Sequence, residues 1–136
     1  MAKFLKYTTL PLIVAIVIFY LCCLITGDDV PEIDDFFIPF DKFAHFMMYL
    51  GLAGSACFSY IFFAKGRVII LRMLFFCILL PILYGGLIEL VQHYYFAGRS
   101  GDWYDFLADA LGAFTAIPFA LFFRKLILRK QLKEQI

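Results

Sequence analysis

Charged residues are scarce in this sequence. Only 17% of its 136 residues are Asp, Glu, Lys or Arg, whereas a soluble domain carries about a quarter. Hydrophobic residues make up 64% of the chain, and its mean hydropathy is +0.89. A net charge of +1 argues against a basic surface for nucleic acid, so no nucleic-acid partner is expected. The composition instead predicts one integral membrane domain over residues 1–136.

The motifs of several enzyme classes are also missing. The four cysteines all lie in apolar stretches, where a thiol packs as a small apolar side chain, and we expect no disulfide. The chain has no serine elbow, no nucleophilic cysteine motif and no H-E-x-x-H zinc motif. Motifs therefore predict no cofactor, no resident metal ion and no catalytic residue.

Long apolar stretches separate the few charges. Each is long enough to cross a hydrocarbon core about 30 Å thick as a helix. Pro81 and Pro118 lie inside two of these stretches and predict kinks there. The predicted fold class is all-α, an integral membrane bundle of four transmembrane helices. The spans are expected at residues 7–27, 41–64, 68–94 and 103–123.

Small residues mark where neighbouring helices can approach closely. The pair Gly85-Gly86 precedes Glu89 and predicts such a contact in the third span. The second and fourth spans carry larger sets of small residues, which are Gly51, Ala53, Gly54, Ser55 and Ala56, and Gly112, Ala113 and Ala116.

Basic residues are sorted along the chain. The N-terminus, the connection between the second and third spans, and the C-terminal tail hold ten of the twelve. Lys42 and Arg99 are the other two, in the segments on the opposite side. Because positive charge stays on the cytoplasmic side of a membrane, both termini are predicted to be cytoplasmic. The ten sorted residues are Lys3, Lys6, Lys65, Arg67, Arg72, Arg124, Lys125, Arg129, Lys130 and Lys133.

Polar residues recur at helical spacing near one end of three spans. Residues three, four, seven or eight positions apart share one face of a helix. Carboxylates within apolar helices are costly in a bilayer and indicate a functional site. The three polar stripes are Asp41, His45 and Tyr49, then Glu89, Gln92 and His93, then Asp102, Asp105 and Asp109.

The predicted topology places these stripes on one side of the membrane. At a rise of 1.5 Å per residue, His45, Glu89 and Asp109 lie about 4–11 Å inward from the outer helix ends. Because charges within a membrane need partners, we predict a polar pocket on the extracytoplasmic side. His93 is expected at the interface rather than in the pocket. The predicted binding residues are Asp41, Lys42, His45, Tyr49, Glu89, Gln92, Arg99, Asp102, Asp105 and Asp109.

Taken together, these motifs resemble the VanZ-like family over about residues 39–115. The family pattern reads D-K-x-x-H-F, then E-x-x-Q, then R-x-x-x-x-D, followed by a helix with Asn and Gly. In this chain Arg99 and Asp105 are one residue farther apart than in that pattern. This chain has Asp109 where the family commonly has Asn, and an additional Asp102, so its pocket is more acidic. The matching residues are Asp41, Lys42, His45, Phe46, Glu89, Gln92, Arg99, Asp105 and Gly112.

This resemblance implies a small multi-pass protein of the bacterial cytoplasmic membrane. The family is named for its association with resistance to the glycopeptide teicoplanin, which implies a role at the cell envelope. It implies no particular reaction, so no catalytic residue is carried over from it.

Four functional interpretations follow. The pocket can bind the head group of a membrane lipid or a lipid-linked cell-wall precursor, with Lys42 and Arg99 contacting phosphate and carboxylates contacting amine or hydroxyl groups. It can instead belong to an enzyme, which could be metal-dependent, acting on a phospholipid or polyprenyl phosphate. A buried charge network can also serve only to fix helix register. Transport is the weakest interpretation, since the cytoplasmic halves are almost wholly apolar and show no polar path.

Overall fold

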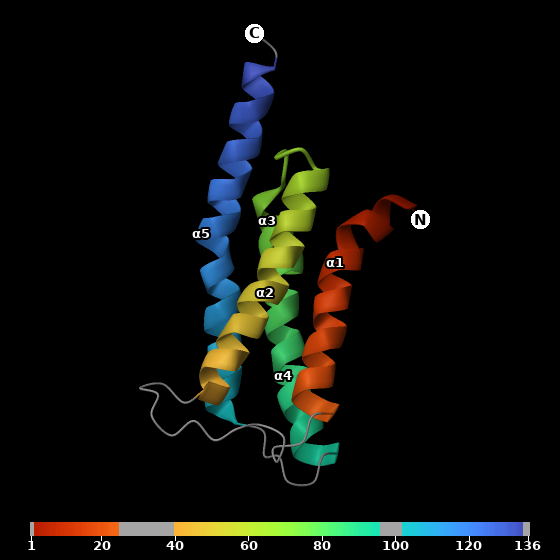
Figure 1. Cartoon of the computed structure of the whole chain (residues 1–136), viewed down its shortest axis with the longest axis vertical. Coiled ribbons are helices and arrows are strands. Elements are labelled where there is room, and N and C mark those ends of the chain that lie inside the picture. The colour runs from red at the N-terminus through yellow and green to blue at the C-terminus, as the bar shows by residue number, and fades with distance from the viewer. Residues whose placement is uncertain (1, 25–39, 96–101, 135–136) are drawn as a thin grey trace.

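The chain forms a bundle of long helices (Figure 1). The computed structural model describes residues 2–24, 40–95 and 102–134, with the backbone alone at residues 2–4. No strand occurs within these ranges. Four helical runs are long and apolar enough to cross a membrane, which confirms the predicted all-α class and number of spans. These runs are Leu5–Leu24, Phe40–Phe63, Ile70–Tyr95 and Trp103–Lys133.

Two of the four runs change helix type along their length. The first consists of α1 (Ala2–Phe19) and a π-helical turn η1 (Tyr20–Leu24), and the second is α2 (Phe40–Phe63). The third consists of α3 (Ile70–Leu74), a π-helical turn η3 (Phe75–Leu79) and α4 (Leu80–Tyr95). The fourth is α5 (Trp103–Lys133). The start of α1 and the end of α5 lie toward the same end of the bundle (Figure 1).

Helices α2 and α5 share the most extensive contact in the bundle. Gly112 on α5 lies directly against the backbone of α2 at Phe46 and Leu50. The predicted small face of α5 is thus confirmed, whereas that of α2 is only partly correct. Gly51 and Gly54 have open space where a Cβ would be. The buried small residues of this contact region are Ala53, Ala56, Ala113, Ala116 and Ala120.

Helix α5 passes through Pro118 without ending there. It then continues beyond residue 123, the predicted end of the fourth span, and includes the basic tail as far as Lys133. Arg124 Nε donates to the carbonyl oxygen of Gly66 at 3.0 Å, within the turn that follows α2. The backbone of Lys65 and Gly66 is left-handed there, with φ of 52° and 73°. The basic tail therefore has a structural role, since it holds this turn against the last part of α5.

The π-helical turn η3 sets which face of α4 points inward. The N–H of Leu80 donates to the carbonyl of Phe75, five residues earlier, directly before Pro81. A π turn holds one residue more than an α turn, so it rotates the following helix by about 100°. Without it, an α-helix continuing from buried Met73 would point residues 80, 84, 87 and 91 inward. The buried residues are instead Pro81, Gly85, Ile88, Glu89 and Gln92.

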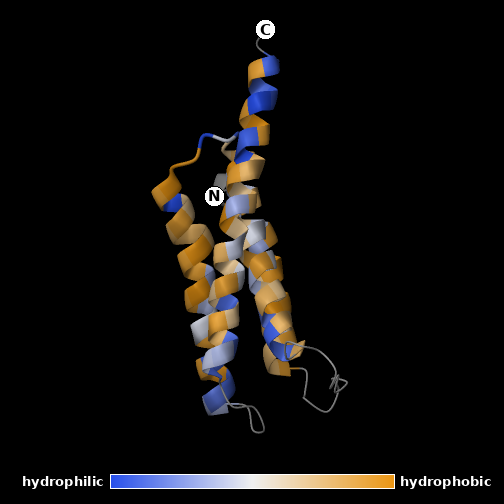
Figure 2. Ribbon diagram, turned by 90° about the vertical axis from the view of Figure 1, so that its left-hand side faces the viewer, coloured by the Kyte–Doolittle hydropathy of each residue, from blue (hydrophilic) through white to orange (hydrophobic). Residues whose placement is uncertain are grey.

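The lateral surface of the bundle is strongly apolar. Hydrophobic residues cover the length of the helices, and hydrophilic residues concentrate at their ends, most densely on the last turns of α5 (Figure 2). Leu71, Leu111 and Phe119 are among many large apolar side chains with more than half of their surface exposed. Soluble proteins rarely expose apolar patches of this extent.

Candidate functional site

Two adjoining groups of polar side chains lie where α2 begins, α4 ends and α5 begins. The outer cluster surrounds one lysine, and the inner cluster surrounds one histidine. Together they contain five carboxylates and a single lysine, which makes this end of the bundle acidic. The outer cluster is Asp41, Lys42, Asp102 and Asp105, and the inner cluster is His45, Glu89 and Asp109.

The outer cluster joins α2 to α5 through the ammonium group of Lys42. Its Nζ lies 2.7 Å from Asp102 Oδ2 and 2.5 Å from Asp105 Oδ1. Asp41 is farther away, at 3.7 Å, and its side chain is 67% exposed. Asp102 and Asp105 thus accept two hydrogen bonds from the ammonium group, which has three donors. Lys42 is therefore already committed to carboxylates of the protein.

Asp102 links the start of α5 to both clusters. Its Oδ1 accepts a hydrogen bond from the N–H of Tyr104 at 2.9 Å, as an N-cap does. Its own N–H donates to Glu89 Oε2 at 2.9 Å. The hydrogen bond from Lys42, followed by that from Tyr104, holds the pKa of the Asp102 carboxyl below its usual range. Asp102 is thus ionised at neutral pH.

The inner cluster is nearly inaccessible to solvent. His45 Nδ1 lies 2.9 Å from Asp109 Oδ1 and 3.8 Å from Glu89 Oε1. The three residues are between 0% and 8% exposed. Each comes from a different helix, α2, α4 or α5, and the phase set by η3 brings Glu89 to this position.

Several buried polar atoms beside this cluster lack a hydrogen-bond partner among the described residues. They are Tyr49 Oη, Glu89 Oε1 and Asp109 Oδ2. Leaving such a group unsatisfied costs about 1–3 kcal/mol, more if it is charged. Orphaned polar atoms at this density in native structures call for a bound ion, water or ligand.

Gly85 makes room for the Asp109 carboxylate. A Cβ on Gly85 would lie 2.6 Å from Asp109 Oδ2 and 3.1 Å from Tyr49 Cε1. The Asp109 carboxylate and the Tyr49 ring therefore both approach the α4 backbone at Gly85, which has no side chain. The close approach predicted at Gly85-Gly86 is confirmed, with Phe106 as the neighbour of Gly86.

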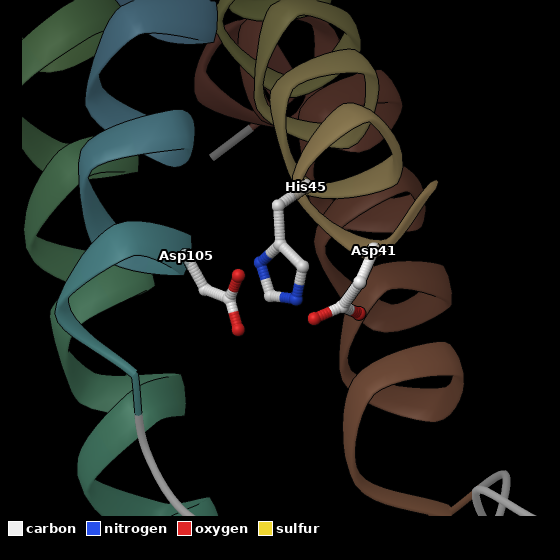
Figure 3. Close-up of side chains that lie close together, drawn as sticks. All are labelled: Asp41, His45 and Asp105. Atoms are coloured by element: carbon white, nitrogen blue, oxygen red, sulfur yellow. The ribbon is translucent and has the colours of Figure 1, made fainter. Parts of the chain in front are cut away.

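Figure 3 shows His45 between two carboxylates, Asp105 from α5 and Asp41 from α2, with a ring nitrogen facing each side. Potential ligand atoms of these three residues all lie within 4.8 Å of one another. The same holds for His45, Glu89 and Asp109. His45 is therefore common to two groups with metal-binding geometry.

Most of the predicted pocket residues meet in this region. Gln92 does not join either cluster, because its Nε2 donates to the carbonyl of Cys22 at 2.7 Å and thereby fastens α4 to η1. His93 is exposed, with its ring edge-to-face against Tyr94. Arg99 lies outside the described residues. The residues brought together are Asp41, Lys42, His45, Tyr49, Glu89, Asp102, Asp105 and Asp109.

A groove of about 700 Å³ between α4 and α5 was not predicted from the sequence. Three residues of its lining are polar, Glu89, His93 and Asp102, and the remainder are apolar or aromatic. The only sequence signal for it is the group of aromatic residues at the start of α5, which resembles ordinary interface aromatics. The apolar and aromatic lining consists of Leu83, Gly86, Leu87, Leu90, Tyr94, Trp103 and Phe106.

Compared with family models, with curated proteins and with solved structures, the chain matches none of them.

Proposed function

We propose that this chain is a VanZ-like, four-span protein of the bacterial cytoplasmic membrane, with both termini in the cytoplasm. The apolar lateral surface supports a membrane location, because water solvates such a surface poorly. The sorting of ten of twelve basic residues supports the orientation. In this orientation both clusters lie at the extracytoplasmic end of the bundle.

Its function, we propose, is to bind the head group of a lipid or of a lipid-linked cell-wall precursor at that face. The observation that carries this proposal is the groove between α4 and α5, where Leu83, Leu87 and Phe106 adjoin Glu89 and Asp102. An apolar wall suits an acyl or prenyl chain, and carboxylate oxygens accept hydrogen bonds from a head group.

The contacts of Lys42 refine which head group fits. Its ammonium is held by Asp102 and Asp105, so a phosphate would have to displace carboxylates of the protein. The clusters contain more carboxylates than cations. An amine or sugar hydroxyl therefore suits these carboxylates better than a bare phosphate. Glycopeptides act on the same membrane face, so occupancy of this site can modulate susceptibility to teicoplanin.

Native mass spectrometry of the gently extracted protein tests this proposal. A tryptophan at Leu87 fills the groove without altering either cluster, so Leu87→Trp should lose the co-purifying lipid. Leu111→Trp is the matched control, since Leu111 is 61% exposed on α5 and lies outside the groove lining. Equal lipid retention by both variants, or no lipid on the wild type, would contradict the proposal.

A metal-dependent enzyme acting on a phospholipid or polyprenyl phosphate is the second candidate function. The spacing of His45, Glu89 and Asp109 favours it. In hydrolysis a carboxylate would take the proton of the attacking water while the phosphorus–oxygen bond to the alcohol breaks and that oxygen is protonated. Chelator-sensitive release of phosphate or alcohol from labelled envelope lipids would establish it. Full release by Glu89→Gln would exclude this mechanism.

A further inference from the structure

The inner cluster lacks the neutralising cation that the outer cluster has. Lys42 forms ion pairs with Asp41, Asp102 and Asp105. Within the described ranges, no lysine or arginine forms an ion pair with Glu89 or Asp109. Two carboxylates buried beside one imidazole carry a net negative charge whether or not the ring is protonated, unless a carboxylate takes up a proton. Buried charge of one sign is costly unless an ion of opposite sign compensates it.

The unpartnered atoms point to where that ion would be. Asp109 is fully buried, and its Oδ2 has no hydrogen-bond partner among the described residues. The same is true of Glu89 Oε1, which is directed toward the His45 ring at 3.8 Å. Tyr49 is also fully buried, and its ring meets the Asp109 carboxylate at Gly85. Three orphaned oxygens therefore lie within or beside the inner cluster.

We propose that His45, Glu89 and Asp109 bind a divalent transition-metal ion. The inference rests on the geometry of these residues and is independent of whether a lipid enters the groove. Nitrogen and carboxylate donors together suit Zn²⁺ or Mn²⁺ better than Ca²⁺ or Mg²⁺, which take oxygen ligands. Zn²⁺ is the first choice, because imidazole nitrogen and carboxylate oxygen are both among its usual ligands.

The separations between the donor atoms fit a single ion. Tetrahedral ligands that bind Zn²⁺ at about 2.0–2.2 Å lie about 3.3–3.6 Å from one another. The observed separations from His45 Nδ1 are 2.9 Å to Asp109 and 3.8 Å to Glu89. Small side-chain rotations therefore suffice to close the site around an ion.

The surroundings also place a carboxylate near the second ring nitrogen of His45, where a metal-binding histidine usually has one. Such a histidine usually donates its second ring N–H to a carboxylate, which fixes the orientation of the ring. With Nδ1 directed at Asp109 and Glu89, the other nitrogen faces the Asp41 carboxylate (Figure 3). Asp41 is thus a positioning residue in this proposal.

The test uses full-length protein in nanodiscs, stripped of metal and carrying no histidine tag. Titration with Zn²⁺, and separately with Mn²⁺, should show one high-affinity ion per chain by calorimetry and elemental analysis. His45→Gln and Glu89→Gln should each weaken binding more than about 100-fold, beyond the loss typical of outer-contact residues. His45 and His93 are the only histidines, so His93→Gln is the matched control and should bind like the wild type.

Two further measurements separate loss of binding from loss of folding. Asp41→Asn alters an exposed side chain and should weaken binding by about 10–100-fold with the fold intact. X-ray absorption of the Zn²⁺-loaded wild type should show one imidazole among oxygen ligands. The proposal is overturned if folded wild-type protein binds neither ion, if His93→Gln weakens binding as much as His45→Gln, or if no imidazole contacts the metal.

Discussion

The contact between α2 and α5 predicts that Gly112→Ala destabilises the bundle. A Cβ at this position would collide with the Phe46 carbonyl and lie 2.9 Å from the Leu50 nitrogen. These are backbone atoms of α2 and cannot rotate away. Ordinary carbon contacts are about 3.5–4.0 Å long, so the helices must separate by on the order of 1 Å.

The magnitude follows from two opposing effects. Overpacking a close contact costs about 1–3 kcal/mol. Replacing glycine by alanine in a compatible helix stabilises by about 0.4–1 kcal/mol, because the unfolded chain loses freedom. A Cβ on Gly51 of α2 would meet no atom within 4 Å, so Gly51→Ala should show only this second effect. Both variants share this second effect, so it cancels in the comparison, and Gly112→Ala should be about 1–3 kcal/mol less stable than Gly51→Ala.

Reversible unfolding in mixed detergent micelles provides the assay. Trp103 is the single tryptophan and lies at the start of α5, so its fluorescence reports on this helix. Separation of α2 from α5 should also lengthen the distance between His45 and Asp109, which the two helices contribute. Equal stabilities for Gly112→Ala and Gly51→Ala would refute the proposed tight contact.

Three further predictions concern the hydrogen bonds, the charges and the orientation. Gln92→Leu removes the hydrogen bond that fastens α4 to η1, so unfolding in the same assay should show a loss of about 0.5–1.5 kcal/mol. In Lys42→Met, carboxyl NMR should show the pKa of Asp102 rising toward its ordinary value, because Lys42 is the main cause of its depression. In the wild type, the ion pair between Lys42 and Asp102 contributes its full stabilisation above the pKa of the unfolded Asp102 carboxyl, and this is lost as the pH falls through the lower pKa of the folded state. An unchanged Asp102 pKa in Lys42→Met would contradict the assignment. A thiol reagent that cannot cross membranes should label Tyr95→Cys in intact cells and Glu134→Cys only after permeabilisation, while the four buried native cysteines stay unlabelled; the reverse pattern would contradict the orientation.

The sequence predicts those parts of the fold that depend on one helix at a time. Length and apolar composition suffice for the four helical runs, because a membrane-crossing helix satisfies its own backbone hydrogen bonds. Helical spacing likewise suffices to place Asp41 and His45 on one stripe of α2. The small face of α5 at Gly112 follows from the same kind of pattern.

Features that depend on contacts between helices were harder to predict. Gln92 has the spacing of a pocket residue, yet its amide pairs with a backbone carbonyl of η1, and no side-chain pattern marks that carbonyl. Gly51 has the composition of a contact residue but faces open space. The sequence also assigned Lys42 to a phosphate, whereas two aspartates from α5 take up its ammonium. Each of these contacts depends on which residue of another helix lies opposite the side chain.

Pro81 shows how a correct local signal can have an unexpected result. The proline predicts a kink, and the structure has the π-helical turn η3 directly before the turn that contains Pro81. A proline lacks the N–H needed to close an α turn. The wide turn accommodates the missing hydrogen bond and rotates the helix that follows it. Hydrophobic periodicity measured over the whole span combines the two helix phases and therefore does not reveal this rotation.

The additional residue within η3 means that sequence insertions and deletions have unequal effects along this span. Deleting one residue between positions 75 and 79 would restore ordinary α-helical winding and leave Glu89 facing His45. The same deletion a few residues later would turn Glu89 about 100° away from the histidine. The wide turn thus acts as a spacer that uncouples the winding of the helix before it, at Ile70–Leu74, from that of the part carrying the carboxylate.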